Sequence, residues 1–405
     1  MMKLGAFGAM ATLLLLTLPA MIGATPAGID QGDFCPLTRI MADGSEEAAG
    51  EVILLEGVNG PVTFLHNVLG ASHIRLEDPS GPVEVTHYRA LLPEYDLIVL
   101  EAALTGAAWP APQAVTAESE TLWTYSRKEP KPFAALCAGS VEVPPGLRLL
   151  HLSASPRGPA PVLDCNGRLV AIGGHLVTTE GILAYGIPSK ALVELQHQSL
   201  EKRALLPLSA LDRPEPRWLN PTLPEGATLC GGLLVREKDM ERGLGYLHKA
   251  VADGPDLAEA FYELGYAYNM QKLGDDAIAA FSRADSLRPC YALALIHSGA
   301  TYFMLRNYAK AESLYLAAGA CDSTNTLVYL NLSGIASLNK RKDKVESYLQ
   351  KVLELDPDKD VARFNLAMVW NSVGRRKDAL EQLRILNENC SYYGVMLDRY
   401  LNKKE

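Results

Sequence analysis

Two hydrophobic patterns divide the chain. Residues 46–198 contain short apolar runs such as EVILL, HIRL, DLIVL, RLLHL, RLVAI and ILAYGI, separated by Gly, Pro and Asn. These runs predict an all-β region, and Asn166-Gly167 predicts a tight hairpin. Residues 224–393 instead repeat a pattern of large and small apolar positions every 34 residues, from starts at Ala258, Ala292, Thr326 and Asp360. We therefore expect a multidomain protein with an all-β part followed by a repetitive all-α part.

The first complete repeat shows what each position does. It has large and small residues at fixed places: Phe261, Leu264, Gly265, Tyr268, Ala277, Phe281, Ala284 and Pro289. Gly265 and Ala277 let two helices approach closely, and Pro289 ends the unit because it cannot continue a helix. The period and these residues resemble the tetratricopeptide-repeat (TPR) family. The resemblance implies an all-α solenoid that binds a protein.

The later repeats keep this framework with some departures. Matching positions are Gly299, Tyr302, Ala311, Tyr315 and Ala318, then Tyr329, Leu332, Leu349 and Pro357, then Leu366, Trp370, Ala379 and Leu383. Ser323 replaces the closing proline of the second of these repeats. A divergent unit with Leu234, Gly243, Leu247, Ala250 and Pro255 precedes them, so we expect five repeats over 224–393. Residues 394–405 are expected to form a polar-ended capping helix.

In the TPR family the first helix of each repeat lines a concave groove where partners bind. The corresponding residues here are Tyr262, Tyr266, Asn269, His297, Phe303, Asn331, Asn365 and Asn371. Ile296 and Phe364 are also candidates, with packing in the core as the alternative. No Lys or Arg occupies these positions, which disfavours a clamp for a C-terminal carboxylate. Asn and Tyr side chains suit a protein or an extended peptide as partner.

Three motifs in the β region resemble exported bacterial peptidases of the trypsin-like family. HNVLGASHI places His66 at the position of the catalytic histidine, EYDLIVLEA places Asp96 at that of the orienting aspartate, and PRGPAPVLDCNGRLVAIGG matches the serine motif and its hairpin. The resemblance covers about 150 residues and implies a trypsin-like double β-barrel over 46–198. Its register puts Gly158 where the nucleophilic serine belongs.

This register predicts a catalytically inactive domain. Glycine has no nucleophile, and Pro156 stands where a backbone N–H of the oxyanion hole is needed, although proline has none. Loss of one oxyanion donor costs on the order of 10²–10³ in rate, and loss of the serine roughly 10⁶. His66, Asp96, Gly158 and Pro156 are then vestigial. Ser153 or Ser155 could replace the nucleophile only through a shifted loop.

The N-terminal 24 residues have the features of a signal peptide: Lys3, an apolar run around Leu13 to Leu18, Pro19 and then small residues. The run is short and interrupted for a membrane span. We expect a secreted or periplasmic protein without stable membrane insertion after cleavage, a linker at 25–45, and a second, Pro-rich linker at 199–223.

Composition excludes several functions. The net charge of −9 offers no basic excess for nucleic acid. Seven scattered cysteines lack the spacing of a zinc site, so we expect no metal, and no motif indicates a cofactor. Cys230, Cys290, Cys321 and Cys390 are interpreted as core filler, while disulfide pairing and oligomeric state stay open.

Three functions follow from these observations. The first is an exported protein-binding scaffold that joins an inactive trypsin-like domain to TPR repeats. The second is an active serine endopeptidase whose repeats select substrates. The third makes the β region a spacer and the solenoid an assembly scaffold for an envelope complex.

Overall fold

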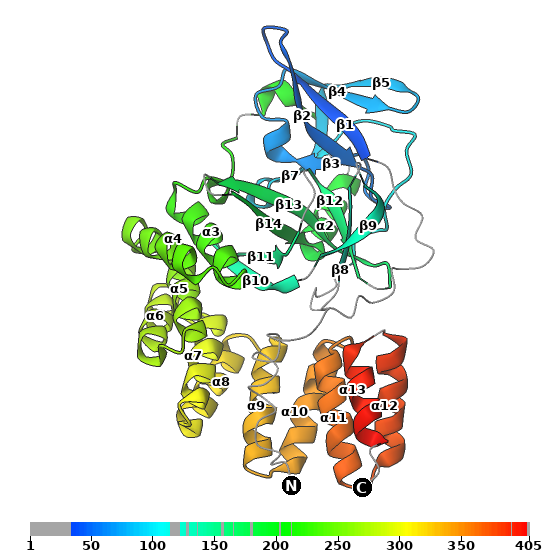
Figure 1. Cartoon of the computed structure of the whole chain (residues 1–405). Helices are drawn as coiled ribbons and strands as arrows, with labels where there is room; N and C mark the ends of the chain where they lie inside the picture. The colour runs from blue at the N-terminus through cyan, green and yellow to red at the C-terminus, as the bar shows by residue number, and fades with distance from the viewer. Residues whose placement is uncertain are drawn as a thin grey trace. The chain divides into compact units, whose positions relative to one another are not determined.

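A computed structural model of the chain describes residues 34–113, 122–126, 129–135, 137–154, 158–164, 166–178, 181–201, 204–211, 213–389 and 391–402. These residues form two compact units, and the division lies between Glu263 and Leu264. Each unit is described by itself (Figure 1). No helix of the described residues combines the length and hydrophobicity that a membrane span requires.

The first unit contains two antiparallel sheets, in agreement with the expected all-β region. The eight-stranded sheet has the order β15-β6-β7-β3-β2-β1-β4-β5. Its elements are β1 (Phe34–Ile40), β2 (Glu46–Ile53), β3 (Val62–Phe64), β4 (His73–Asp78), β5 (Gly81–Val85), β6 (His87–Leu92), β7 (Leu97–Leu100) and β15 (Leu206–Pro207), with the 3₁₀ turns η2 (Leu65–Asn67) and η3 (Pro93–Tyr95). The pairing of β1 with β2 shows that the sheet begins before residue 46, inside the segment expected to be a linker.

The seven-stranded sheet has the order β10-β11-β14-β13-β12-β8-β9. Its elements are β8 (Leu122–Ser126), β9 (Glu129–Ala135), β10 (Cys137–Val143), β11 (Leu147–Leu152), β12 (Ala160–Leu163), β13 (Leu169–Thr178) and β14 (Gly181–Pro188), followed by α2 (Ser189–Leu200). The hairpin predicted at Asn166-Gly167 is confirmed between β12 and β13. Asp164 accepts the backbone N–H groups of Asn166 and Arg168, and Gly167 has a positive φ of 76°, which glycine adopts at little cost.

The linker predicted at 199–223 is instead packed on the first unit. β15 pairs with β6, and two short turns follow, η4 (Leu208–Ala210) and η5 (Arg217–Leu219). Trp218 is 2% exposed within the main core. Its Nε1–H donates to the carbonyl of Glu94 at 2.9 Å. The prolines prevent long regular structure here, but apolar burial still holds the segment in place.

The first helix of the repeat region belongs to the same core as the sheets. In α3 (Pro224–Arg236) every residue from Gly226 to Arg236 is buried. Two adjacent glycines explain how it fits. A Cβ on Gly231 would lie 2.6 Å from Leu247 of α4 (Met240–Asp253), and one on Gly232 would lie 2.4 Å from Val141 of β10. Each glycine therefore permits close approach on a different side of α3.

The helices continue in pairs. After α3 and α4 come α5 (Ala258–Met270), α6 (Gly274–Leu287), α7 (Ala292–Met304), α8 (Tyr308–Cys321), α9 (Thr326–Leu338), α10 (Lys342–Leu355), α11 (Asp360–Ser372), α12 (Arg376–Glu388) and α13 (Tyr392–Leu401). The first helices of successive pairs begin 34 residues apart, from Pro224 to Asp360. α5 crosses the division between the units.

In the second unit, small residues again let paired helices meet. A Cβ on Gly265 would lie 2.7 Å from Phe281, and one on Gly299 would lie 2.8 Å from Tyr315. The final helix α13 packs on α11 and α12 and covers Phe364 through Tyr393, whose rings lie 5.5 Å apart. It begins at Tyr392, slightly before the expected cap.

Candidate functional site

The structure brings His66 and Asp96 together. Nδ1 of His66 lies 2.5 Å from Oδ2 of Asp96, and the backbone N–H of His66 donates to Oδ1 at 3.0 Å. Asp96 is fully buried at the end of η3 in a left-handed conformation with φ of 58°. The imidazole stacks on Phe64, with ring centroids 5.4 Å apart. The carboxylate thus fixes the orientation of the imidazole and leaves Nε2 for other contacts.

The electrostatics of the pair favour the charged imidazolium. Burial alone would lower the pKa of His66, but the hydrogen bond and negative charge of Asp96 outweigh it and the net shift is upward. Glu215, from the Pro-rich segment, also raises the pKa of His66 through its charge. The segment predicted to be a linker therefore contributes a charge near this pair.

Gly158 has a backbone that a serine would adopt only with strain. Its φ is +100°, and a Cβ built on it would lie 3.5 Å from Oε2 of Glu51. Gly158 therefore has no hydroxyl that could act as a nucleophile. Its backbone conformation is unfavourable for any L-residue, and a side chain placed there would lie next to the carboxylate of Glu51. Pro156 and Ser155 lie outside the described residues, and Ser153 is exposed just after β11.

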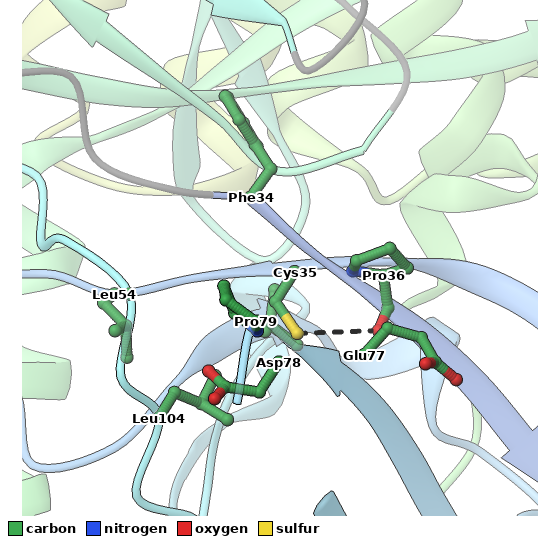
Figure 2. A pocket seen from close by; sticks show the side chains of 10 residues that line it. Phe34, Cys35, Pro36, Leu54, Glu77, Asp78, Pro79 and Leu104 are labelled. Carbon is green, nitrogen blue, oxygen red and sulfur yellow. Dashed lines mark hydrogen bonds between the residues drawn. The ribbon is translucent and has the colours of Figure 1, made fainter. Parts of the chain in front are cut away.

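A separate cavity of about 190 Å³ lies in the first sheet (Figure 2). It is lined by Phe34, Cys35, Pro36, Val52, Leu54, Glu77, Asp78, Pro79, Leu104 and Gly106. The carboxylate of Asp78 accepts hydrogen bonds from Ser80 and from the N–H and hydroxyl of Thr105. These bonds hold the pKa of Asp78 far below its usual value. The carboxylate of Asp78 therefore links Ser80 and Thr105 through hydrogen bonds.

A buried ion pair joins the helices of the first unit to strand β10. Arg236 of α3 and Glu263 of α5 approach to 2.7 Å, with side chains 3% and 0% exposed. Oε1 of Glu263 also accepts the backbone N–H of Glu142 at 2.7 Å. A helical side chain thereby satisfies a donor at the edge of the sheet, which otherwise would be open to pairing.

Tyr262, predicted to face a partner, is enclosed in this contact. It is only 4% exposed, and burial raises the pKa of its hydroxyl, with contributions from the charges of Glu263 and Glu142. Tyr262 therefore exposes almost no surface to a partner in this structure. The charge of Glu142 that acts on it places strand β10 nearby, which the repeat period could not reveal.

The other predicted groove residues lie in the second unit and are all half-buried. The rings of Tyr266 and His297 meet edge to face at 5.6 Å, and Phe303 packs on Tyr308 at 5.2 Å. Nδ2 of Asn331 donates to the carbonyl of Leu327 in its own helix.

The remaining groove candidates divide into polar and core residues. Oδ1 of Asn269 has no donor among the described residues, while Asn365 and Asn371 are half-buried on α11. Ile296 and Phe364 are 2% and 5% exposed and belong to the core.

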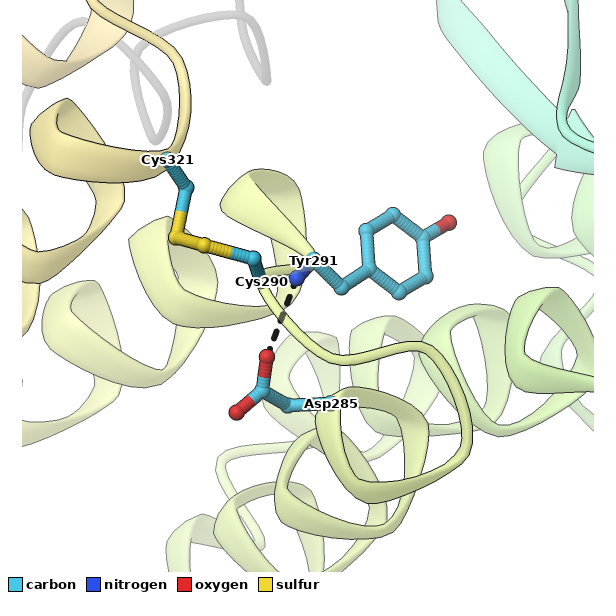
Figure 3. Close-up of a disulfide and its surroundings, with 4 residues drawn as sticks. All are labelled: Asp285, Cys290, Tyr291 and Cys321. Atoms are coloured by element: carbon cyan, nitrogen blue, oxygen red, sulfur yellow. Dashed lines mark hydrogen bonds between the residues drawn. A yellow bond between two sulfur atoms is a disulfide. The ribbon is translucent and has the colours of Figure 1, made fainter.

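Two cysteines interpreted as core filler form a disulfide instead. Cys290 follows α6, and Cys321 ends α8; their Cα atoms are 5.4 Å apart (Figure 3). Cys230 is a buried core residue, as expected, and Cys390 lies outside the described residues. The described residues contain no group of three His, Cys, Asp or Glu side chains arranged to hold a metal.

No protein-family model matches the chain. It is 29% identical over 187 residues to the human protein O-mannosyl-transferase TMTC3, covering 43% of this chain and 20% of that protein. It is 27% identical over 149 residues to anaphase-promoting complex subunit 6 of Arabidopsis thaliana, covering 36% and 26%. The chain therefore spans only 20% and 26% of the lengths of the two curated relatives it matches.

Solved structures similar to the chain include two TPR proteins. One is a thermophilic TPR protein of Thermus thermophilus, with 21% identity, a TM-score of 0.38, and coverage of 44% of this chain and 96% of that one. The other is YrrB, described as a TPR protein with an unusual peptide-binding site, with 21% identity, a TM-score of 0.34, and coverage of 43% and 89%. The first helices of successive pairs in the C-terminal region of this chain begin 34 residues apart, which is the spacing of tetratricopeptide repeats.

Proposed function

We propose that this chain is an exported protein-binding scaffold in which a catalytically inactive, trypsin-like β region is built into the start of a TPR solenoid. The observation that carries the binding role is the row of residues that continues from Glu263. His297, Asn331 and Asn365 follow Glu263 at intervals of 34 and occupy the same position in their repeats.

The first member of this row already binds a strand. Glu263 accepts a backbone N–H of β10. A side chain at this repeat position can therefore form a hydrogen bond with the backbone of an extended segment. Asn and His side chains offer hydrogen-bonding groups for the same purpose. Asn269, Phe303 and Asn371 share a second repeat position and add polar and aromatic contact area beside the row. An extended protein segment fits such a surface.

The proposal of an inactive β region rests on Gly158. The bond between His66 and Asp96 is what a general base would need, and it favours the second candidate, an active serine endopeptidase. The glycine, its positive φ and the carboxylate of Glu51 oppose that candidate. The Cys290–Cys321 disulfide supports export, because disulfides persist in oxidising compartments.

One set of variants tests both parts. Asn331→Leu with Asn365→Leu in the full chain should abolish the protein partners that cross-link to wild type in the native envelope, as read by mass spectrometry. Asn387→Leu, on the exposed face of α12, is the matched control. A fluorophosphonate probe should leave wild type unlabelled. Unchanged partners in the double variant would refute the groove assignment, and labelling that His66→Ala removes would establish the peptidase.

A further inference from the structure

The turns between paired helices carry exposed cations in the last three repeats. The residues are Arg306, Lys310, Lys340, Lys342, Lys344, Arg376 and Lys377, here called the basic edge. Two contacts show that consecutive turns adjoin: Nζ of Lys342 lies 3.3 Å from Oγ of Ser372, and Arg341 lies 3.3 Å from Glu312. The edge therefore forms one surface within the second unit, whereas the chain as a whole has a net charge of −9.

Several of these cations occupy positions where they weaken the helices. Asp276 lies in the first turn of α6, where a carboxylate favours the helix dipole, but the equivalent positions 34 and 68 residues on are Lys310 and Lys344. A cation there costs about 0.3–1 kcal/mol. Arg306 and Lys340 also have positive φ values of 62° and 55°, as Lys238 and Lys272 do at the same position of the two earlier repeats, where Gly374 stands in the last repeat. Local stability does not explain these residues.

Within the described part of the chain, most of the basic edge has no acidic partner. Among the described residues, Arg306, Lys310, Lys340, Lys344 and Lys377 form no ion pair. The acids Asp343 and Asp378 lie in the same first turns, but Asp378 is bonded to Arg375. The surface retains a positive excess, which would steer an acidic partner toward it.

Apolar side chains are interspersed with these cations. Met304, Leu305 and Tyr308 are 43%, 54% and 38% exposed at the turn between α7 and α8. Val373 is 45% exposed at the turn between α11 and α12. A purely electrostatic ligand would not require them, whereas a protein segment with large apolar residues would bury them.

We infer that the basic edge docks an acidic segment of a partner protein that carries large apolar residues among its carboxylates. This inference rests on the proposed protein-binding function and adds a second contact outside the groove. The observations favour a protein segment over nucleic acid or an anionic membrane, because apolar anchors accompany the cations at two of the three turns and the chain as a whole is acidic.

The test uses the full chain and a fluorescein-labelled peptide of Glu-Glu-Leu repeats. Binding should be measurable by anisotropy, should weaken as salt is raised, and should be lost with a Gln-Gln-Leu peptide. Lys344→Glu with Lys377→Glu should weaken binding about tenfold or more. The same variant should unfold at a temperature no lower than wild type, because both changes place carboxylates in first helical turns.

Lys190→Glu with Lys249→Glu is the matched control, since it changes net charge equally at exposed lysines of the first unit. Equal binding by both double variants, equal binding of the Gln peptide, or tighter binding of phosphatidylglycerol vesicles or single-stranded DNA would overturn the inference. The proposed function is judged separately. If cross-linked partners depend on Asn331 and Asn365 but not on the basic edge, only this inference fails.

Discussion

The buried ion pair between Arg236 and Glu263 offers a quantitative test of how the solenoid begins. Glu263→Ala would leave the guanidinium enclosed at 3% exposure without its carboxylate and remove the acceptor of the Glu142 N–H. Breaking one partner of a buried pair costs about 3–5 kcal/mol, a large part of the stability of a typical domain. We expect a correspondingly lower unfolding midpoint for the first unit.

Urea unfolding followed by tryptophan fluorescence would measure this, because Trp109, Trp123 and Trp218 all lie in the first unit. Glu84→Ala is the control, because it also lies in the first unit. It removes a comparable 2.8 Å bond to Arg75, but both side chains are partly exposed, so the cost should be about 1 kcal/mol or less.

A second comparison separates charge from packing. Glu263→Met with Arg236→Met should recover most of the stability, because no buried charge is left unpaired. Equal midpoints for Glu263→Ala and Glu84→Ala would refute the reasoning, since the helices would then not be joined to β10 through a buried pair.

Three further predictions concern single sites. Gly158→Ser should restore no ester hydrolysis above a His66→Ala control and should cost about 1–2 kcal/mol in urea unfolding, because its φ is +100°; turnover that requires His66 would contradict this. Burial and the charge of Arg236 lower the pKa of His151 from 6.5 to about 4. Since the unfolded chain binds the proton more tightly, up to about 3 kcal/mol of stability present above pH 6.5 should be lost as the pH falls toward 4, and His151→Leu should remove that dependence. Non-reducing peptide mapping should recover Cys290 linked to Cys321, and reduction should destabilise the solenoid by about 3–4 kcal/mol, as expected for a sequence separation of 31; separate thiol peptides would refute the bond.

The repeat period alone determined the helical half of this protein. After α3, the helices bury their apolar faces mainly against their sequence neighbours, so local positions such as Gly265 and Phe281 reveal the contact directly. The β-rich pattern and the Asn166-Gly167 hairpin were predictable for a similar reason, since turn chemistry acts over a few residues.

The sequence also indicated that His66 and Asp96 meet, but only through resemblance to a family, because thirty residues separate them. The sequence could not show where the segment at 199–223 packs, for the opposite reason. Its prolines exclude long helices or strands, whereas the burial of Trp218 depends on distant partners such as Tyr185, whose ring lies 5.4 Å away.

Only the tertiary structure decided where the solenoid is open to partners. Periodicity gives Tyr262 and Tyr266 the same inward direction, but in the tertiary structure Tyr262 is 4% exposed and Tyr266 is half-buried. In the sequence, only the adjacent Gly231 and Gly232 indicated that this helix is covered, because two small residues side by side in one helix indicate close neighbours on two sides. Which neighbour lies on each side depends on how the sheet packs against the helix. Packing between segments that are distant in the sequence produces no periodic pattern of apolar residues, so the sequence does not reveal it.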